Sequence, residues 1–94
     1  MTNKKTVVNL NSDLCSGLED FIKGGGITLQ SVEYVPAIYE AQFIRIHYIK
    51  SHCIGEEWEH EQKDHKIHLS FKLIKLFIDN GITEEVLTTG IIFN

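Results

Sequence analysis

The residues best suited to metal chemistry lie in one segment, residues 52–68, which contains four of the five histidines of this 94-residue chain. Imidazole nitrogens and carboxylate oxygens are common protein ligands of zinc and of non-haem iron. If the segment is helical, Glu61, His65 and His68 stand at positions i, i+4 and i+7 and share one face. This spacing predicts a zinc or iron site at those three residues.

The same histidines have a simpler interpretation, as polar residues on the solvated face of a charged helix. The segment contains no HExxH sequence and does not have the spacing of a Cys/His zinc module. His52 or Cys53 would have to complete the metal site from another element. His52 beside Cys53 also suggests thiol catalysis, but neighbours on a strand point to opposite faces, so we do not expect an enzyme.

The negative charge of the protein is concentrated in the same segment. Five acids and one lysine between residues 56 and 64 account for the whole formal net charge of −4. An acidic patch repels nucleic-acid phosphates and attracts basic protein surfaces. We therefore expect a basic protein partner and no direct binding of nucleic acid.

Trp58, the only tryptophan, lies among these acids. It either packs on a sheet and anchors a helix, or serves as a binding anchor, since aromatic residues ringed by charges are frequent hot spots of protein complexes. With the acidic segment as its binding surface, the chain is expected to be an inhibitor, an immunity protein against a nuclease toxin, or a phage-type antagonist. The predicted partner-binding residues are Glu56, Glu57, Trp58, Glu59, Glu61 and Asp64.

The elements that position these residues can be predicted from periodicity and punctuation. A short strand is expected within residues 5–11, and then a helix with an apolar stripe at Leu14, Leu18, Phe21 and Ile22. The following glycines, residues 24–26, end that helix and do not form a phosphate loop, which would precede a helix.

Two strands are expected next, at residues 27–35 and 38–50, with Pro36 between them. In the second strand Phe43, His47 and Ile49 share one face, while Ile44, Ile46 and Tyr48 share the other. An alternative makes Pro36 the first residue of a helix. A ligand site near Phe43, Arg45 and His47 has no motif to support it.

Residues 56–79 have two competing interpretations. Polar residues recur in steps of three and four without glycine or proline, which favours one long helix. The alternation of Ile67, Leu69, Phe71 and Leu73 instead fits an acidic turn followed by a strand and a short helix. With the long helix, a helical turn after Gly81 and a terminal strand, the order is β-α-β-β-α-β.

That order predicts an α+β two-layer sandwich of ferredoxin-like topology, in which two helices cover one face of an antiparallel sheet. We expect one domain, residues 1–94, small enough to gain stability from a homodimer. No signal-peptide core or membrane span is visible, and two cysteines are too few for a disulfide framework. A cytoplasmic location, of a bacterial or phage protein, is expected.

Overall fold

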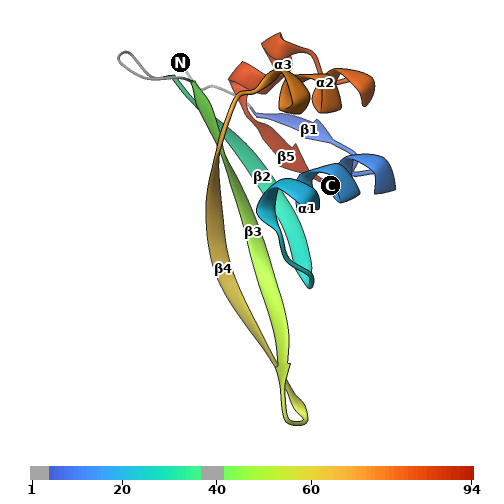
Figure 1. The fold of residues 1–94 in the computed structure, drawn as a ribbon, viewed down its shortest axis with the longest axis vertical. Coiled ribbons are helices and arrows are strands. Elements are labelled where there is room, and N and C mark those ends of the chain that lie inside the picture. The colour runs from blue at the N-terminus through green and yellow to red at the C-terminus, as the bar shows by residue number, and fades with distance from the viewer. Residues whose placement is uncertain (1–4, 37–41) are drawn as a thin grey trace.

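The computed structural model describes residues 5–36 and 42–94, which form an α+β fold with a five-stranded mixed sheet and three helices (Figure 1). The elements are, in chain order, β1 (Thr6–Val8), α1 (Ser12–Ile22), β2 (Ile27–Val35), β3 (Phe43–Ile54), β4 (Glu57–His68), α2 (Phe71–Asp79), α3 (Glu84–Thr89) and β5 (Ile91–Phe93). The strand predicted for residues 38–50 is confirmed from Phe43 onward, where the alternative of a helix beginning at Pro36 is wrong, and its first part lies outside the described residues.

The sheet has the strand order β1-β5-β2-β3-β4. The short outer strand β1 pairs in parallel with β5, whereas β5 with β2, β2 with β3, and β3 with β4 are antiparallel. The predicted ferredoxin-like order is therefore wrong in detail, because the described residues form one strand and one helix more than expected and the sheet contains a parallel pair. The α+β class and the placement of helices on one face are retained.

The long helix predicted for residues 56–79 is also wrong. Gly55, with a φ of 65°, and Glu56 form a two-residue turn, after which β4 pairs with β3 along twelve residues. Only from Phe71 is the chain helical, with the Ser70 hydroxyl accepting a hydrogen bond from the Leu73 N–H at 3.2 Å. Most of β4 is exposed on both faces, so polar residues occupy both faces and the two-residue period of a half-buried strand is lost.

The helix α1 begins and ends close to the predicted residues. The Asn11 side chain accepts a hydrogen bond from the Leu14 N–H at 2.8 Å, and Lys23 adopts the left-handed conformation at a φ of 63°. Gly26, with a φ of 67°, then approaches the backbone of β3 so closely that a Cβ there would clash with the Ser51 carbonyl oxygen. The glycines after α1 therefore serve both as a helix stop and as a close contact with the sheet.

All three helices pack on one face of the sheet, which we call the helix-covered face (Figure 1). The buried core lies between that face and the helices and is formed by Leu14, Leu18, Leu29, Val32, Ile44, Ile46, Tyr48, Ile67, Leu73, Phe77, Ile82, Leu87 and Ile91. The other face, which we call the open face, carries Phe43, Arg45 and His47 of β3. The predicted division of β3 into two faces is thus confirmed.

Candidate functional site

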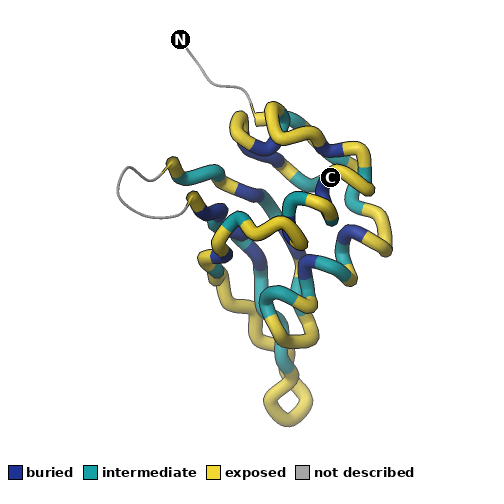
Figure 2. Tube along the Cα trace, turned by 45° about the horizontal axis from the view of Figure 1, so that its top comes forward, coloured by how far each residue is buried: buried dark blue, intermediate teal, exposed yellow. Residues whose placement is uncertain are grey.

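The most distinctive feature of the surface is a projecting hairpin, residues 51–64, which we call the hairpin arm; residues 51–60 are two-stranded, and residues 61–64 continue β4 along the three-stranded part of the sheet. It consists of the ends of β3 and β4 and extends beyond the helices, giving the molecule principal extents of 45 × 29 × 28 Å (Figure 1). Every residue from 53 to 64 is exposed (Figure 2). The arm therefore contributes nothing to the core, and its side chains are available to a partner.

Two-residue turns of this kind fix the register of a hairpin. Gly55 has a positive φ and Glu56 does not, which is the φ pattern of a type II′ turn. The register that follows pairs Ile54 with Glu57, Cys53 with Trp58 and His52 with Glu59. Each β4 side chain is thereby assigned to one face of the arm.

The predicted partner-binding residues divide between the two faces of the arm. Glu57, Glu59 and Glu61 share the face of Ile67, which belongs to the core, and so lie on the helix-covered side beyond the helices. We call these three carboxylates the acid row. Trp58 and Asp64 lie on the open side, and Glu56 is in the turn. A single flat surface containing all six predicted residues does not exist in this fold.

Ion pairs within the sheet offset part of the negative charge, because Glu61 lies 3.6 Å from Lys63 and Asp64 lies 4.0 Å from Arg45. Glu59 lies 3.4 Å from His52, which compensates charge only when its imidazole is protonated. These side chains are between 38% and 57% exposed, so each pair contributes little to stability. Glu56 and Glu57 have no ion-pair partner among the described residues, which leaves the tip of the arm with the least compensated charge.

Trp58 is 65% exposed and lies across the ladder from Cys53. The expectation that it anchors a helix on the sheet is therefore wrong. On the opposite side of the tip Ile54 is 56% exposed. Each face of the tip thus presents one large apolar side chain to solvent.

The proposed metal ligands are separated by the strand. Glu61 and His65 share a face but lie four residues apart, about 13 Å along a strand, and His68 is on the other face beside Phe43. His52 pairs with Glu59, and the Cys53 thiol donates to the Gly55 carbonyl oxygen at 3.2 Å. Within residues 5–36 and 42–94, no three His, Cys, Asp or Glu side chains are grouped as a metal site requires.

The open face carries a polar cluster near Arg45. His47 lies 3.5 Å from Glu33, and Arg45 pairs with Asp64, so Arg45 is an ion-pair residue as its position on a strand face suggests. Across the ladder from Arg45, the Lys66 ammonium lies 4.1 Å from the centre of the Phe43 ring. These contacts link three strands but do not form a nucleophile and base arrangement.

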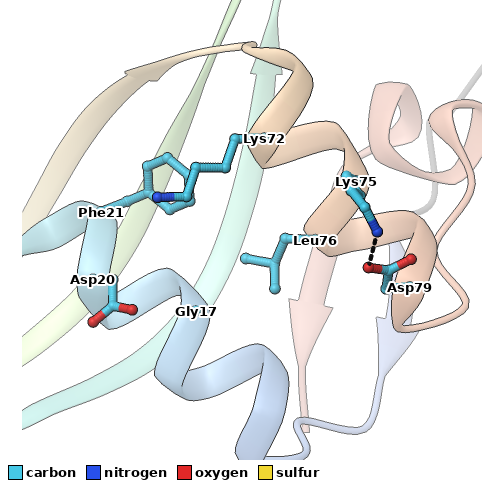
Figure 3. Close-up of a pocket in the computed structure, with 7 residues that line it drawn as sticks. All are labelled: Gly17, Asp20, Phe21, Lys72, Lys75, Leu76 and Asp79. Carbon is cyan, nitrogen blue, oxygen red and sulfur yellow. Dashed lines mark hydrogen bonds and ion pairs between the residues drawn. The ribbon is translucent and has the colours of Figure 1, made fainter.

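A cavity of about 270 Å³ lies between α1 and α2 and was not predicted (Figure 3). Its lining combines apolar Phe21 and Leu76 with a charged rim, in which Lys75 bonds Asp79 at 2.8 Å. Gly17 makes room for Leu76, because a Cβ at residue 17 would clash with the leucine methyl groups. A glycine inside a helical pattern was the one sequence signal of this close helix contact.

The two thiols lie in different environments. Cys15 packs against the core, and its thiol donates to Glu19 at 3.4 Å. Burial raises the pKa of the Cys15 thiol, and the hydrogen bond and negative charge of Glu19 raise it further. Cys53 is exposed on the arm. The hydrogen bonds of the two thiols among the described residues go to a carboxylate and to a backbone carbonyl, and neither is to a histidine base.

Comparison with family models, with curated proteins and with solved structures gives no match to this chain. None of the described helices is long and apolar enough to cross a membrane. The function must therefore be inferred from the surface of the molecule itself. Its most informative part is the hairpin arm.

Proposed function

We propose that this protein is an acidic binding module of the inhibitor or immunity type, and that its hairpin arm recognises a basic protein surface. The observation that carries the proposal is the placement of the acid row along an exposed strand, with Glu57 and Glu59 on the projecting hairpin and Glu61 at its base. A segment that buries no core residue has no structural need for three carboxylates in line. Its composition is free to serve a partner.

The acid row matches a linear basic surface. Successive side chains on one face of a strand are about 6.7 Å apart, so the three carboxylates extend over about 13 Å. Evenly spaced negative charges on a narrow support suit a groove lined by lysine and arginine, such as one that otherwise binds phosphates. Long-range attraction would speed the encounter and orient the arm.

The apolar side chains at the tip favour insertion over flat contact. Ile54 and Trp58 lie on opposite faces of the hairpin, so a flat partner would cover only one of them. A cleft that takes in the tip would bury both, and buried aromatic residues supply much of the binding energy in protein complexes. The partner is therefore a protein with a basic cleft.

The test is affinity purification from the native host followed by mass spectrometry, comparing two variants of equal charge. The first replaces the acid row by Glu57→Gln, Glu59→Gln and Glu61→Gln. The second removes three charges from the body by Glu19→Gln, Asp20→Asn and Glu33→Gln. We expect the first variant to lose the partner and the second to retain it. Retention of the partner by both variants would remove the acid row from the proposal.

A metal-binding function has no comparable support. The strand geometry separates Glu61, His65 and His68, whereas the prediction of a zinc or iron site required them on one helical face. Elemental analysis of untagged protein tests the point directly. We expect zinc and iron well below one equivalent per chain.

A further inference from the structure

The strand β4 leaves one edge of the sheet open. It is last in the strand order and extends for twelve residues, and within the described parts of the chain no strand pairs with its outer side. A long free edge offers backbone N–H and C=O groups to another strand. The question is what chemistry that edge would accept.

The outward backbone groups can be assigned from the turn. In a two-residue hairpin the residues that flank the turn, Ile54 and Glu57, form a hydrogen-bonded pair. Odd-numbered residues of β4 therefore bond to β3, and even-numbered residues direct N–H and C=O outward. Consistent with this alternation, the Leu69 N–H donates inward to the Gln42 carbonyl at 2.9 Å.

The odd-numbered side chains of β4 change from acidic to basic or neutral at Gln62, near the middle of the strand. On the side of the turn the odd positions are all glutamates, whereas on the other side they are Lys63, His65 and Ile67. The even positions place Trp58 and His60 before Gln62, and Asp64 and Lys66 after it. A strand with this arrangement is complementary to a second copy of itself in the antiparallel direction.

We propose that two copies of this chain pair through their β4 edges, with a two-fold axis perpendicular to the sheet at Gln62. Such an axis keeps the faces of the two sheets aligned, and Gln62, whose backbone groups point outward, then forms a hydrogen-bonded pair with itself. Across this interface Glu61 faces Lys63 of the second copy, Glu59 faces His65, Glu57 faces Ile67, Trp58 faces Lys66, and His60 faces Asp64.

Charge selects this register over its neighbours. With the two-fold symmetry and the outward hydrogen bonds kept, the neighbouring registers are those in which the axis passes through residue 61 or residue 63. Centring on Glu61 places two glutamates directly opposite each other, and centring on Lys63 does the same with two lysines. With Gln62 on the axis, no like charges are opposed.

The pairing also covers the most exposed aromatic residue of the arm. Trp58 of the second copy would lie beside Lys66, next to Phe43 and His68, whose rings pack edge to face at 6.4 Å. The indole would thus extend an existing aromatic group on the open face. The interface combines backbone hydrogen bonds, complementary charge and two covered tryptophans, one from each copy.

This inference goes beyond the proposed function and does not depend on it. Pairing uses the outer edge of β4, whereas the acid row projects from a face of the arm. In the pair, the two open edges join into one sheet with all helices on the same side. In the pair Trp58 is covered, and Lys63 and His65 of the second copy stand opposite Glu61 and Glu59, so pairing competes with capture of a basic partner by the arm.

Charge reversal at positions 61 and 63 tests the register. Glu61→Lys opposes two lysines at each of two symmetric positions, and Lys63→Glu opposes two glutamates. We expect either change to raise the dimer dissociation constant in sedimentation equilibrium by about tenfold or more. The double variant, Glu61→Lys with Lys63→Glu, restores opposite charges and should restore the dimer. Glu56→Lys, in the turn and outside the register, is the matched control.

Mixing the two single variants gives the sharpest result. Glu61→Lys carries lysine at positions 61 and 63, and Lys63→Glu carries glutamate at both, so a mixed pair has complementary charges throughout. We expect the mixture to form a heterodimer at concentrations where each variant alone is a monomer. Failure of the folded variants to form it would overturn the proposed register.

A proline at the axis tests the backbone contribution without a change of charge. The Gln62 N–H points outward, so Gln62→Pro removes a donor from the interface and none from the β3–β4 ladder. We expect the proline variant to be a monomer with a preserved far-ultraviolet spectrum and Gln62→Ala to remain a dimer. The proposal is overturned if the wild-type chain is monomeric throughout the concentration series. If Gln62→Pro then also loses a host protein, the β4 edge binds a strand of that protein and not a second copy of this chain.

Discussion

The body of the molecule and the hairpin arm are built from the same β3 strand but are stabilised in different ways. In the body, Ile44 and Ile46 are fully buried beneath the helices, and side-chain burial determines which residue types stand at each position. In the arm, both faces are exposed to solvent (Figure 2). The strands are held together by the backbone ladder and the turn. The body therefore shows what the fold requires, and the arm shows what the fold leaves free for function.

The largest difference between the two regions should appear on truncating a large apolar side chain. Phe77 is 1% exposed in the core, and Phe77→Ala should lower the free energy of unfolding by about 3–5 kcal/mol. Ile54, at the tip of the arm, is 56% exposed, and Ile54→Ala should change it by less than about 0.5 kcal/mol. Urea denaturation of both variants measures the contrast. A large loss from Ile54→Ala would mean that the arm packs against something within the chain.

Two glycines with nearly the same backbone angle give a smaller and cleaner contrast. Gly26 and Gly55 have φ of 67° and 65°, so alanine at either is strained by about 1–2 kcal/mol. At residue 26 the added Cβ also meets the Ser51 carbonyl oxygen, whereas at residue 55 nothing lies within 4 Å. We expect a total loss of about 2–5 kcal/mol for Gly26→Ala and only the strain for Gly55→Ala. Equal losses in denaturant titrations would contradict the close contact between Gly26 and β3.

The sequence predicts the buried elements of the body better than the exposed strands of the arm. The α1 stripe and the two faces of β3 were predicted, because a buried face imposes its period on the sequence. The β4 strand was not predicted, because both of its faces are exposed and carry polar residues without a two-residue period. Its formation depends on the turn at Gly55 and on pairing with β3. Pairing with a distant segment outweighed the local helical pattern. The cavity between α1 and α2 depends on the close approach of the two helices at Gly17. The periodicity of each helix does not predict which residues of the other helix it contacts.

The candidate site was predicted in composition and misassigned in geometry. The acidic segment is exposed, as a binding surface requires. However, the two-residue period of a strand puts Trp58 on the face opposite the acid row, whereas a helix would distribute the six predicted partner-binding residues with a period of about 3.6 residues. The same geometry separates His68 from Glu61 and His65. Residue types survive a wrong secondary-structure assignment, whereas every statement about a shared face changes with it.

The smallest expected difference concerns the two cysteines, one in each region. Cys15 packs against the core and its thiol has a raised pKa, so at pH 8 a smaller fraction of it is thiolate than for a cysteine with the ordinary pKa. Cys53 is exposed on the arm. Limited alkylation with iodoacetamide at pH 8, followed by peptide mass spectrometry, should label Cys53 several-fold faster than Cys15. Preferential labelling of Cys15 would show that α1 opens more readily than its packing implies.

The most direct test of the central claim, that the arm serves recognition and not stability, is to shorten it in register. Deleting residues 53, 54, 57 and 58 retains the Gly55–Glu56 turn and leaves His52 opposite Glu59 as the new closing pair, which is also a hydrogen-bonded pair. We predict a free energy of unfolding within about 1 kcal/mol of the full-length protein, together with loss of partner capture from the native host. Capture at the full-length level by the shortened, folded protein would contradict the account.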